Sequence, residues 1–338
     1  MKKILWCLLW APFFCAAQSV TFKALTENNK TSLRGLSLVN EKIIWLSGSN
    51  GSVGRSVDGG VTFEWLKPKR YEKLDFRDIE AFDDQQAIIV NAGSPAYILK
   101  TTDGGKNWTE HYKNLDSAIF LDGMGFWGKD KGIIFGDPIN NKMQLLKTVN
   151  AGRSWEDITS NLTVNMAEGE AAFAASGSTI KTLAGGKVWI ATGGKVSNIY
   201  FSSDYGQRWK VFKCPILQGE NSTGPFSIDF YDAKHGIAVG GNYLKDKENA
   251  NNILLTADGG KTWTKPRIPV SGYRSGVTYL NAKVLVATGT SGTDISYDGG
   301  YTWKKISDKS FNVIQSLKKE NAFILAGEKG SVYKLVLN

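Results

Sequence analysis

The sequence predicts an all-β protein in which seven four-stranded units close into a ring, a seven-bladed β-propeller. Three observations lead to this fold class. A short turn motif recurs six times, strand-like segments surround each copy, and the segments near the two ends of the chain complement one another. A four-stranded unit repeated every roughly 40–50 residues is typical of a propeller.

The recurring motif reads Ser or Thr, any residue, Asp, any residue, Gly, any two residues and an aromatic. One match would be weak support, but six matches separated by 40 to 54 residues indicate a repeat architecture. The third position of the motif is occupied by Asp58, Asp103, Asn150, Asp204, Asp258 and Asp298.

The residue types of the motif are those of a tight turn between two strands. An Asp side chain accepts hydrogen bonds from backbone N–H groups a few residues on, and Gly adopts the positive φ that such a turn requires. The aromatic residue begins the next strand. We therefore interpret the six Asp and Asn residues as structural, and not as catalysts or calcium ligands.

The segments around each motif alternate between apolar and polar residues and are rich in β-branched and aromatic residues. No stretch shows sustained helical periodicity, so the pattern predicts short strands. In the first unit these strands are expected at 34–40, 43–47, 52–56 and 61–66, and in the second at 76–82, 87–91, 97–101 and 107–112.

The last unit has three predicted strands, at 311–317, 322–326 and 330–335, and no segment for a fourth. The missing strand is expected near the other end, because residues 20–25 (VTFKAL) resemble the fourth strand of the first unit, residues 61–66 (VTFEWL). The N-terminal strand would then complete the seventh blade and remove a free sheet edge.

Residues 1–17 have the pattern of a secretory signal peptide: Lys2 and Lys3, then an apolar stretch, then small residues up to Ala17. The apolar stretch falls short of the ~20 residues that a spanning helix needs. The bulky residues before Cys15 argue against a lipid-modified cysteine. We expect cleavage near Ala17, one domain over residues 18–338, and a periplasmic or secreted protein.

The amino-acid composition limits the kinds of functional site that the chain can form. The chain is 42% hydrophobic and 22% charged, which indicates a globular fold. It has only two histidines, and Cys214 is the one cysteine outside the leader, so neither a metal site nor an internal disulfide is expected. The net charge of +9 is spread over the repeats, with no nucleic-acid-binding motif. We expect a monomer without cofactors, with calcium at loop carboxylates of 245–252 left open.

In this topology the motif turns share one face of the ring, and the long irregular segments share the other. Loops on a rigid scaffold are where binding usually occurs, so the face opposite the motifs is the predicted working face. The segments expected there are 67–75, 112–119, 137–143, 158–169, 213–226 and 242–252.

Residues that open the first strand of each blade are expected to surround the mouth of the central channel on that face. Guanidinium groups there would suit carboxylate or phosphate recognition. The alternative is that the charges pair with one another and brace the ring. The predicted mouth residues are Arg34, Arg77, Asp78, Asp122, Glu170, Ser227, Tyr273, Arg274 and Asn312.

The motif matches the Asp-box, or bacterial neuraminidase repeat, and the chain resembles the photosystem II stability/assembly factor family and its bacterial relatives. The stretches that carry the resemblance are SLRGLSLVNEKIIWLSGSNGSVGRSVDGG, DFRDIEAFD, PAYILKTTDGGKNW and SGYRSGVTYL. The resemblance implies a seven-bladed propeller that binds partner proteins during assembly of a membrane complex. It makes Arg34, Arg77 and Arg274 the carried-over contact residues.

The enzyme alternative is a sialidase-like glycosidase or a glycan-binding propeller. Sialidases also carry Asp-boxes, and they use an arginine triad, a tyrosine nucleophile with a glutamate, and an acidic proton donor. Tyr273, Glu170 and Asp122 would fill the catalytic roles. The Arg-Ile-Pro triplet at 267–269 resembles a further sialidase signature, but it follows the fifth motif, whereas that family places it before the first.

The sequence favours a non-catalytic binding protein over the glycosidase. It predicts an assembly or stability factor for an envelope or membrane complex that binds a protein partner through the face opposite the Asp-boxes. An anionic ligand or a glycan at the channel mouth stays open as a second kind of partner.

Overall fold

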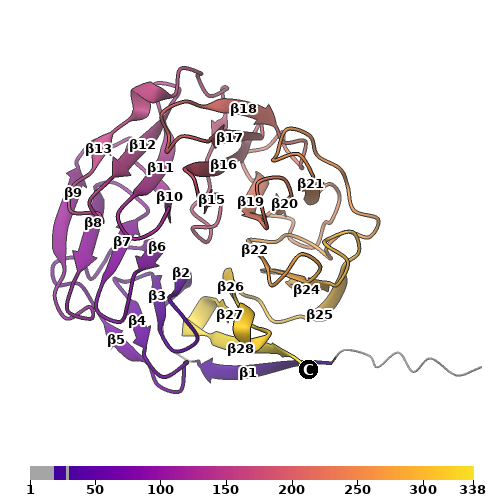
Figure 1. Cartoon of the computed structure of the whole chain (residues 1–338), viewed down its shortest axis with the longest axis horizontal. Coiled ribbons are helices and arrows are strands. Elements are labelled where there is room, and N and C mark those ends of the chain that lie inside the picture. The colour runs from indigo at the N-terminus through magenta and orange to yellow at the C-terminus, as the bar shows by residue number, and fades with distance from the viewer. Residues whose placement is uncertain (1–18, 28–29) are drawn as a thin grey trace, which may run out of the picture.

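The computed structural model describes residues 19–27 and 30–338, and the predicted leader lies outside them. Seven sheets are arranged around a central channel (Figure 1), which confirms the all-β, seven-bladed prediction. The helices of the described residues are three short 3-10 turns: Thr159–Asn161, Lys318–Glu320 and Glu328–Gly330. None of the helices in this part of the chain is long and apolar enough to cross a bilayer.

The strands of each blade follow one another from the channel outward, each antiparallel to its neighbour. Blade 1 has β2 (Leu33–Leu38), β3 (Ile44–Gly48), β4 (Val53–Ser56) and β5 (Glu64–Leu66). Blade 2 has β6 (Phe76–Ala81), β7 (Ala87–Asn91), β8 (Ala96–Thr101) and β9 (Thr109–Asn114). Blade 3 has β10 (Leu121–Phe126), β11 (Gly132–Ile139), β12 (Lys142–Thr148) and β13 (Glu156–Asp157).

Blades 4 to 7 complete the ring. Blade 4 has β14 (Glu170–Ala171), β15 (Ile180–Leu183), β16 (Lys187–Gly194), β17 (Asn198–Ser202) and β18 (Lys210–Lys213). Blade 5 has β19 (Thr223–Phe230), β20 (Gly236–Asn242) and β21 (Ile253–Thr256). Blade 6 has β22 (Gly276–Tyr279), β23 (Leu285–Gly289), β24 (Gly292–Ser296) and β25 (Lys304–Ser307). Blade 7 has β26 (Val313–Leu317), β27 (Ala322–Ala326), β28 (Val332–Leu337) and β1 (Val20–Thr26).

Strand β1 pairs antiparallel with β28, with Phe22 opposite Leu335. The N-terminal strand therefore supplies the outer strand of the last blade, as the sequence predicts. This pairing joins the two ends of the chain and covers the edge of β28, which would otherwise be open to pairing with another molecule.

The Asp-box turns have one hydrogen-bond pattern in all six copies. In the first copy the Ser56 hydroxyl donates to Asp58 Oδ1 at 2.8 Å and accepts the Gly60 N–H at 2.9 Å. Asp58 Oδ1 also accepts the Thr62 N–H at 2.9 Å, which closes the turn into the fourth strand. Gly59 and Gly60 have φ of 76° and 86°, a region that favours glycine. The residues of the motif thus stabilise the turn between the third and fourth strands.

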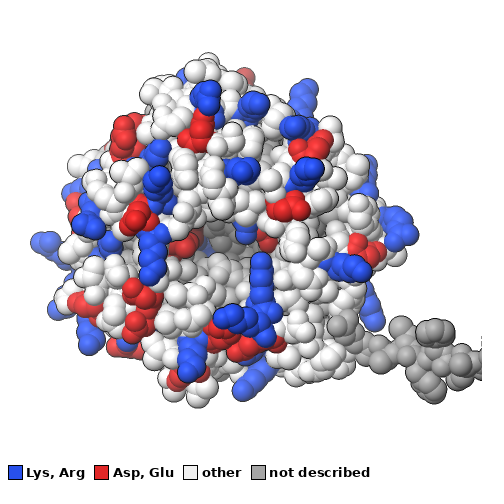
Figure 2. Space-filling view, in the orientation of Figure 1, with Lys and Arg blue, Asp and Glu red and all other residues white. Residues whose placement is uncertain are grey.

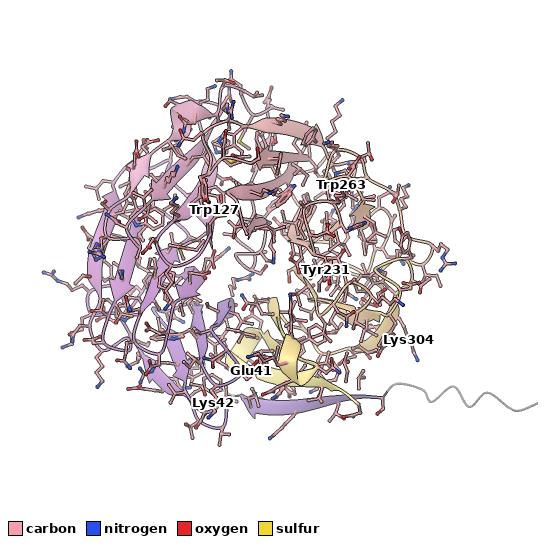
Figure 3. The ribbon with its side chains drawn as sticks, viewed as in Figure 1. Glu41, Lys42, Trp127, Tyr231, Trp263 and Lys304 are labelled. Carbon is pink, nitrogen blue, oxygen red and sulfur yellow. The ribbon has the colours of Figure 1, made fainter. Side chains whose placement is uncertain are left out.

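The hydrophobic core is divided into layers between neighbouring blades. Each of the seven contacts between blades has its own buried cluster; the cluster between blades 1 and 2, for example, contains Trp45, Phe76 and Ile79. Indole N–H groups add polar links across these layers. Trp127 of blade 3 donates to the Lys187 carbonyl of blade 4 at 2.6 Å (Figure 3).

Two blades depart from the four-strand pattern. In blade 5 the fourth strand is reduced to one bridge between Leu255 and Thr264. Pro266 and Pro269 follow directly, and proline has no N–H to give to a strand ladder. In blade 4 the innermost strand is split, because β14 and β15 both pair with β16 and residues 172–179 loop out between them.

The six Asp-box turns join third to fourth strands, so they lie on one face of the ring, which we call the motif face. The loops between second and third strands and the connections between blades lie on the opposite face, which we call the mouth face. The predicted irregular segments are located there, although 137–143 is largely taken up by the hairpin of β11 and β12.

Candidate functional site

The channel opens on the mouth face into a cavity of about 390 Å³. Six blades contribute one residue each to its lining, from the same position at the start of the innermost strand. In blades 1, 2, 3 and 5 this residue falls at a register shift, the signature of a β-bulge that redirects a side chain. The six residues are Arg34, Arg77, Asp122, Phe226, Ser275 and Asn312.

Blade 4 contributes a loop in place of a single residue. Residues 172–178, which we call the plug, leave the split innermost strand and project into the ring centre beside β15 (Figure 1). The Ser176 hydroxyl donates to the Ser275 carbonyl at 2.6 Å, and Ser178 donates to the Ser227 hydroxyl at 2.7 Å. The plug separates the mouth cavity from a second chamber, because residues 172–175 line the first and 176–178 the second.

Arg34 and Arg77 are side by side at the mouth and hold the plug. Arg34 Nη1 donates to the Ala175 carbonyl at 3.0 Å, and Arg77 Nη1 donates to the Ala174 carbonyl at 3.3 Å. Burial and then the neighbouring charge of Arg77 lower the pKa of Arg34. The side chains remain 26% and 33% exposed, so the pair presents positive charge to the cavity.

Each arginine has one ion-pair partner within 4 Å among the described residues. Arg77 Nε donates to Asp75 at 2.8 Å, and Arg34 Nη2 lies 3.9 Å from Glu328. Part of the charge is therefore paired within the ring, in line with the bracing alternative. Arg77 Nη2 and Arg34 Nε have no hydrogen-bond partner among the described residues, so both guanidinium groups keep donor capacity for a ligand.

A pair of carboxyl groups lies in the same cavity. Asp122 is 1% exposed, and neither of its carboxyl oxygens has a hydrogen-bond partner among residues 19–27 and 30–338. Burial, and next the charge of Asp137, raise the pKa of Asp122 well above its usual value; Arg77 and the nearby N–H groups of Asp137 and Ala174 oppose the shift without reaching hydrogen-bond geometry. Asp137 accepts one bond, from the Ala172 N–H at 3.0 Å.

Aromatic rings form another wall of the cavity. Phe173 of the plug stacks on Phe226 with ring centroids 4.1 Å apart, and Tyr273 meets Phe226 edge-on at 4.9 Å. Tyr243 approaches Phe226 from outside and is 47% exposed. The mouth therefore combines cations, carboxyl groups and aromatic faces, as expected of a pocket that binds a polar segment in a fixed orientation.

Tyr273 lines this cavity, as predicted, but it is almost fully buried. Burial raises the pKa of its hydroxyl, and Arg34 opposes that shift only in part. Its hydroxyl stays protonated at neutral pH.

Arg274 does not reach the mouth, contrary to the prediction. Arg274 directly precedes the mouth residue Ser275, just as Leu33 in blade 1 directly precedes the bulge residue Arg34. The side chain of Leu33 is fully buried between blades. A shift of one residue along a strand sends a side chain to the opposite face. Arg274 is therefore in the core, where Nε donates to Asp294 Oδ2 at 2.7 Å and Nη1 to Ser291 at 2.7 Å.

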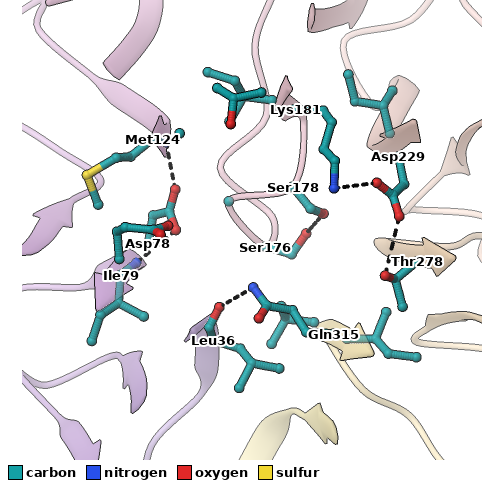
Figure 4. Close-up of a pocket in the computed structure, with 18 of the residues that line it drawn as sticks. Leu36, Asp78, Ile79, Met124, Ser176, Ser178, Lys181, Asp229, Thr278 and Gln315 are labelled. Atoms are coloured by element: carbon teal, nitrogen blue, oxygen red, sulfur yellow. Dashed lines mark hydrogen bonds and ion pairs between the residues drawn. The ribbon is translucent and has the colours of Figure 1, made fainter. Parts of the chain in front are cut away.

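Asp78 also departs from its predicted place, for the same reason. It follows the bulge residue Arg77, and its carboxylate accepts the N–H groups of Ile79 at 2.8 Å and Met124 at 2.6 Å. It joins blades 2 and 3 beside the second chamber, on the far side of the plug (Figure 4). Burial raises the pKa of Asp78 well above the usual range.

Glu170 lies inside blade 4 and does not line the mouth. Its Oε1 accepts bonds from Asn198 Nδ2 and the Tyr200 hydroxyl, both at 3.0 Å, and from Thr192. Its Oε2 accepts the Ala167 N–H at 2.9 Å. Both oxygens are used inside the blade, where they hold the short strand β14 against its neighbours.

These placements separate the residues that a sialidase-like site would need. Arg34, Arg77, Asp122 and Tyr273 meet at the mouth, but the third arginine and the glutamate are buried within blades 6 and 4. The arginine triad and the tyrosine–glutamate pair are not formed. The Arg-Ile-Pro triplet at 267–269 lies in the outer part of blade 5, where Arg267 Nη2 is 3.4 Å from Asp298.

Sequence reasoning missed the plug and, in the aromatic wall, Phe173, Phe226 and Tyr243. A signal for the plug existed, because residues 171–179 (AAFAASGST) are small and do not alternate where other blades have their first strand. Phe226 sits at the bulge position of blade 5, but recognising it requires the register of β19 with β20.

The second chamber lies on the motif-face side of the plug and has a volume of about 310 Å³. Lys181 Nζ lies 2.7 Å from Asp229 across it, and Gln315 bridges to the Leu36 carbonyl (Figure 4). Figure 2 shows the hollow at the ring centre with acidic and basic side chains at its edge. Burial raises the pKa of Glu80, which also lines the chamber, to about 7. The described residues contain no group of three or more His, Cys, Asp and Glu side chains able to hold a metal ion.

Comparison with known proteins supports the resemblance inferred from the motifs. The chain is 24% identical over 332 residues to the photosystem II assembly lipoprotein Ycf48 of Synechococcus sp. (strain CC9902), covering 95% of this chain and 90% of that protein. No family model matches the sequence. The chain is thus similar to the photosystem II assembly factors over nearly its whole length, as predicted.

Solved structures agree on the fold. A structure described as YCF48 bound to D1 peptide has a TM-score of 0.68 at 17% identity, covering 94% of this chain and 97% of that one. YCF48 from Cyanidioschyzon merolae has a TM-score of 0.66, also at 17% identity, with 93% and 98% covered. The GH74 xyloglucanase from Xanthomonas campestris reaches 0.59 at 12% identity, over 93% of this chain and 53% of that one.

Proposed function

We propose that the protein is an exported, non-catalytic propeller that assists assembly or stability of a membrane or envelope complex by binding a segment of a partner protein at the channel mouth. Its similarity to a photosystem II assembly lipoprotein, and the likeness of its fold to a structure of YCF48 with a D1 peptide, support this kind of role. The relative's description as a lipoprotein is in keeping with export.

The observation that carries the proposal is the convergence of Arg34 and Arg77 in one cavity on the mouth face. Two guanidinium groups with free donors suit an acidic side chain or a terminal carboxylate of a polypeptide. The aromatic rings beside them provide apolar contact area with little conformational freedom to lose, which is favourable at protein interfaces.

Capture of the partner from envelope extract with a crosslinker tests the proposal. The variant Arg34→Gln/Arg77→Gln removes both charges while keeping side chains that donate toward the plug carbonyls. The control Lys106→Gln/Lys261→Gln makes the same charge change at two exposed motif-face residues. A thermal unfolding curve for each protein verifies the fold.

We expect one or more membrane-complex proteins to be captured by the wild type and the control and lost from the arginine variant. Equal capture by all three folded proteins would reject the mouth as the binding site. Capture of nothing by the wild type, together with binding on a glycan array, would favour the glycan alternative.

A further inference from the structure

We propose that the mouth cavity also holds a basic side chain, Lys or Arg, of the bound segment, with Asp122 as its receptor. The inference rests on the proposed function, because it concerns which segment the same cavity selects. The recognised segment would carry an acidic group for Arg34 and Arg77 and a basic group for Asp122.

The first reason is the incomplete bonding of Asp122. A buried carboxyl group is normally supplied with several donors, as Asp78 and Glu170 are in this ring. Asp122 is 1% exposed, and neither of its carboxyl oxygens accepts a hydrogen bond among the described residues. An ammonium or guanidinium group would provide the missing donors together with opposite charge.

The second reason is the position of Asp122 in its strand. It occupies the bulge position of blade 3, as Arg34 and Arg77 do in blades 1 and 2, and the three residues line one cavity. Because bulge residues of neighbouring blades point into the same space, a ligand that reaches the arginines also meets Asp122.

The third reason is the charge around Asp122. Asp137 also lines the cavity and accepts a single N–H bond, so two carboxyl groups share one wall. Neither forms an ion pair within 4 Å in the described part of the chain. Arg77 is the nearby cation, but its Nε and Nη1 are already bonded to Asp75 and to the Ala174 carbonyl. The wall therefore has unused capacity for positive charge.

The fourth reason is the shape of the cavity. Phe173, Phe226 and Tyr273 line it beside the carboxyl groups. The alkyl stem of Lys or Arg packs well along such aromatic faces while its charged end reaches a carboxylate. A volume of about 390 Å³ is sufficient for one such side chain and part of the neighbouring backbone.

The test uses phage-displayed random dodecapeptides selected separately on four immobilised full-length proteins. These are the wild type, Asp122→Asn, Arg34→Gln/Arg77→Gln and a control, Asp130→Asn, which changes an exposed carboxylate on the motif face. We expect wild type and control to enrich peptides with both acidic and basic residues. Asp122→Asn should keep the acidic enrichment and lose the basic one, and the arginine variant should do the reverse.

One selected peptide, synthesised with Lys or Arg and with Gln at the enriched basic position, then gives a double-mutant cycle. The Gln peptide should bind wild type about tenfold or more weakly, as expected for a lost charged hydrogen bond, and bind Asp122→Asn as well as the basic peptide does. The same basic enrichment on Asp122→Asn and wild type would overturn the inference and leave the proposed function standing. Enrichment of no peptide by the wild type would instead overturn the proposed function.

A third outcome is also informative. If Asp122 is protonated and donates to a carbonyl or carboxylate of the segment, wild type should show no basic enrichment at all, which would also overturn the inference. Asp122→Asn is expected to fold, because it removes a buried carboxyl group that lacks donors and keeps its shape.

Discussion

Arg274 donates from Nε to the Asp294 carboxylate at 2.7 Å inside blade 6, and their side chains are 0% and 1% exposed. Nη2 donates to Asp294 as well and to Ser271, and Nη1 donates to Ser291 and to the Tyr273 carbonyl. An arginine that the sequence places with Arg34 and Arg77 is therefore a structural member of the ring. Burial lowers its pKa, and Asp294 opposes that shift.

Replacing Arg274 with Met should lower the free energy of unfolding by about 3–5 kcal/mol, because Asp294 would be left buried without its partner. The double variant Arg274→Met/Asp294→Leu should regain most of this loss. Urea unfolding followed by tryptophan fluorescence measures both. Arg208→Met, which removes an exposed ion pair with Asp204, is the control and should cost no more than about 0.5 kcal/mol. Equal midpoints for wild type and Arg274→Met would contradict this account.

Glu170→Ala should lower the free energy of unfolding by about 3 kcal/mol, because it strips hydrogen bonds from Asn198, Tyr200 and the Ala167 N–H inside blade 4. Glu168→Ala, at a side chain that is 97% exposed, should have little effect. Peptides selected by the wild type should bind Glu170→Ala unchanged below its unfolding transition. Loss of binding by a folded Glu170→Ala protein would instead indicate a role at the mouth.

The Asp-boxes should contribute stability that is lost in acid. Burial opposes ionisation of Asp258, but hydrogen bonds from Thr262 and Thr256 dominate and lower its pKa to about 2. A carboxylate whose pKa is lower in the folded state stabilises the fold above its unfolded pKa near 4, and this contribution disappears as the pH falls through about 2. After allowance for solvent screening, the Asp258 carboxylate should contribute about 1 kcal/mol to the free energy of unfolding.

Asp258→Asn measures this contribution, because Asn150 shows that Asn forms the same turn, with Thr148 and Ser154 as its partners. Wild type should be the more stable protein at pH 5, and the difference should vanish near pH 2, in urea unfolding at each pH. A difference that does not change between these pH values would show that the Asp258 charge is not involved.

Glu80 should have the opposite pH dependence. Burial in the second chamber raises its pKa to about 7, and Lys181 opposes the shift. A carboxyl group whose pKa is raised on folding costs no stability below its unfolded pKa, and its cost grows as the pH rises toward the folded value. Glu80→Gln should therefore unfold at a higher temperature than wild type at pH 8, and at a similar temperature at pH 4. Scanning calorimetry at both pH values, with the exposed Glu156→Gln as control, tests this; a destabilised Glu80→Gln at pH 8 would contradict it.

The residue pattern alone determined the ring. In blades 1 to 6 the Asp-box turn fixes where the third strand ends and the fourth begins, since the Asp, Gly and Ser or Thr of the motif encode a local turn that needs no distant partner. The likeness of residues 20–25 to 61–66 was enough to predict that β1 completes blade 7, because the same alternation fits the same outer position. The hydrogen bonds of a turn and the alternation of apolar and polar residues in a strand are properties of short segments, so both can be predicted from the sequence without knowledge of tertiary contacts.

Only part of the mouth could be predicted from the sequence, and two of the wrong placements, those of Asp78 and Arg274, have one cause. Arg34, Arg77 and Asp122 line the mouth because each stands at the bulge position of its strand, and Asn312 lines it from the corresponding position directly before β26, where the ladder has no bulge. Asp78 and Arg274 each stand one residue away from that position, and a single-residue step reverses the direction of a side chain. The residue that forms the bulge is set by how the first strand pairs with the second strand of its blade. This register is established only in the assembled sheet.

The plug and the unpartnered Asp122 were decided by the tertiary structure alone. Residues 172–178 occupy the channel because Arg34, Arg77, Ser227 and Ser275, from four other blades, meet them there. Whether a buried carboxyl group accepts a hydrogen bond depends on all the elements packed around it, so it is decided only in the assembled ring. Sequence by itself therefore determined the fold, its repeats and its closure, whereas the composition of the mouth depended on contacts between blades that are distant in the chain.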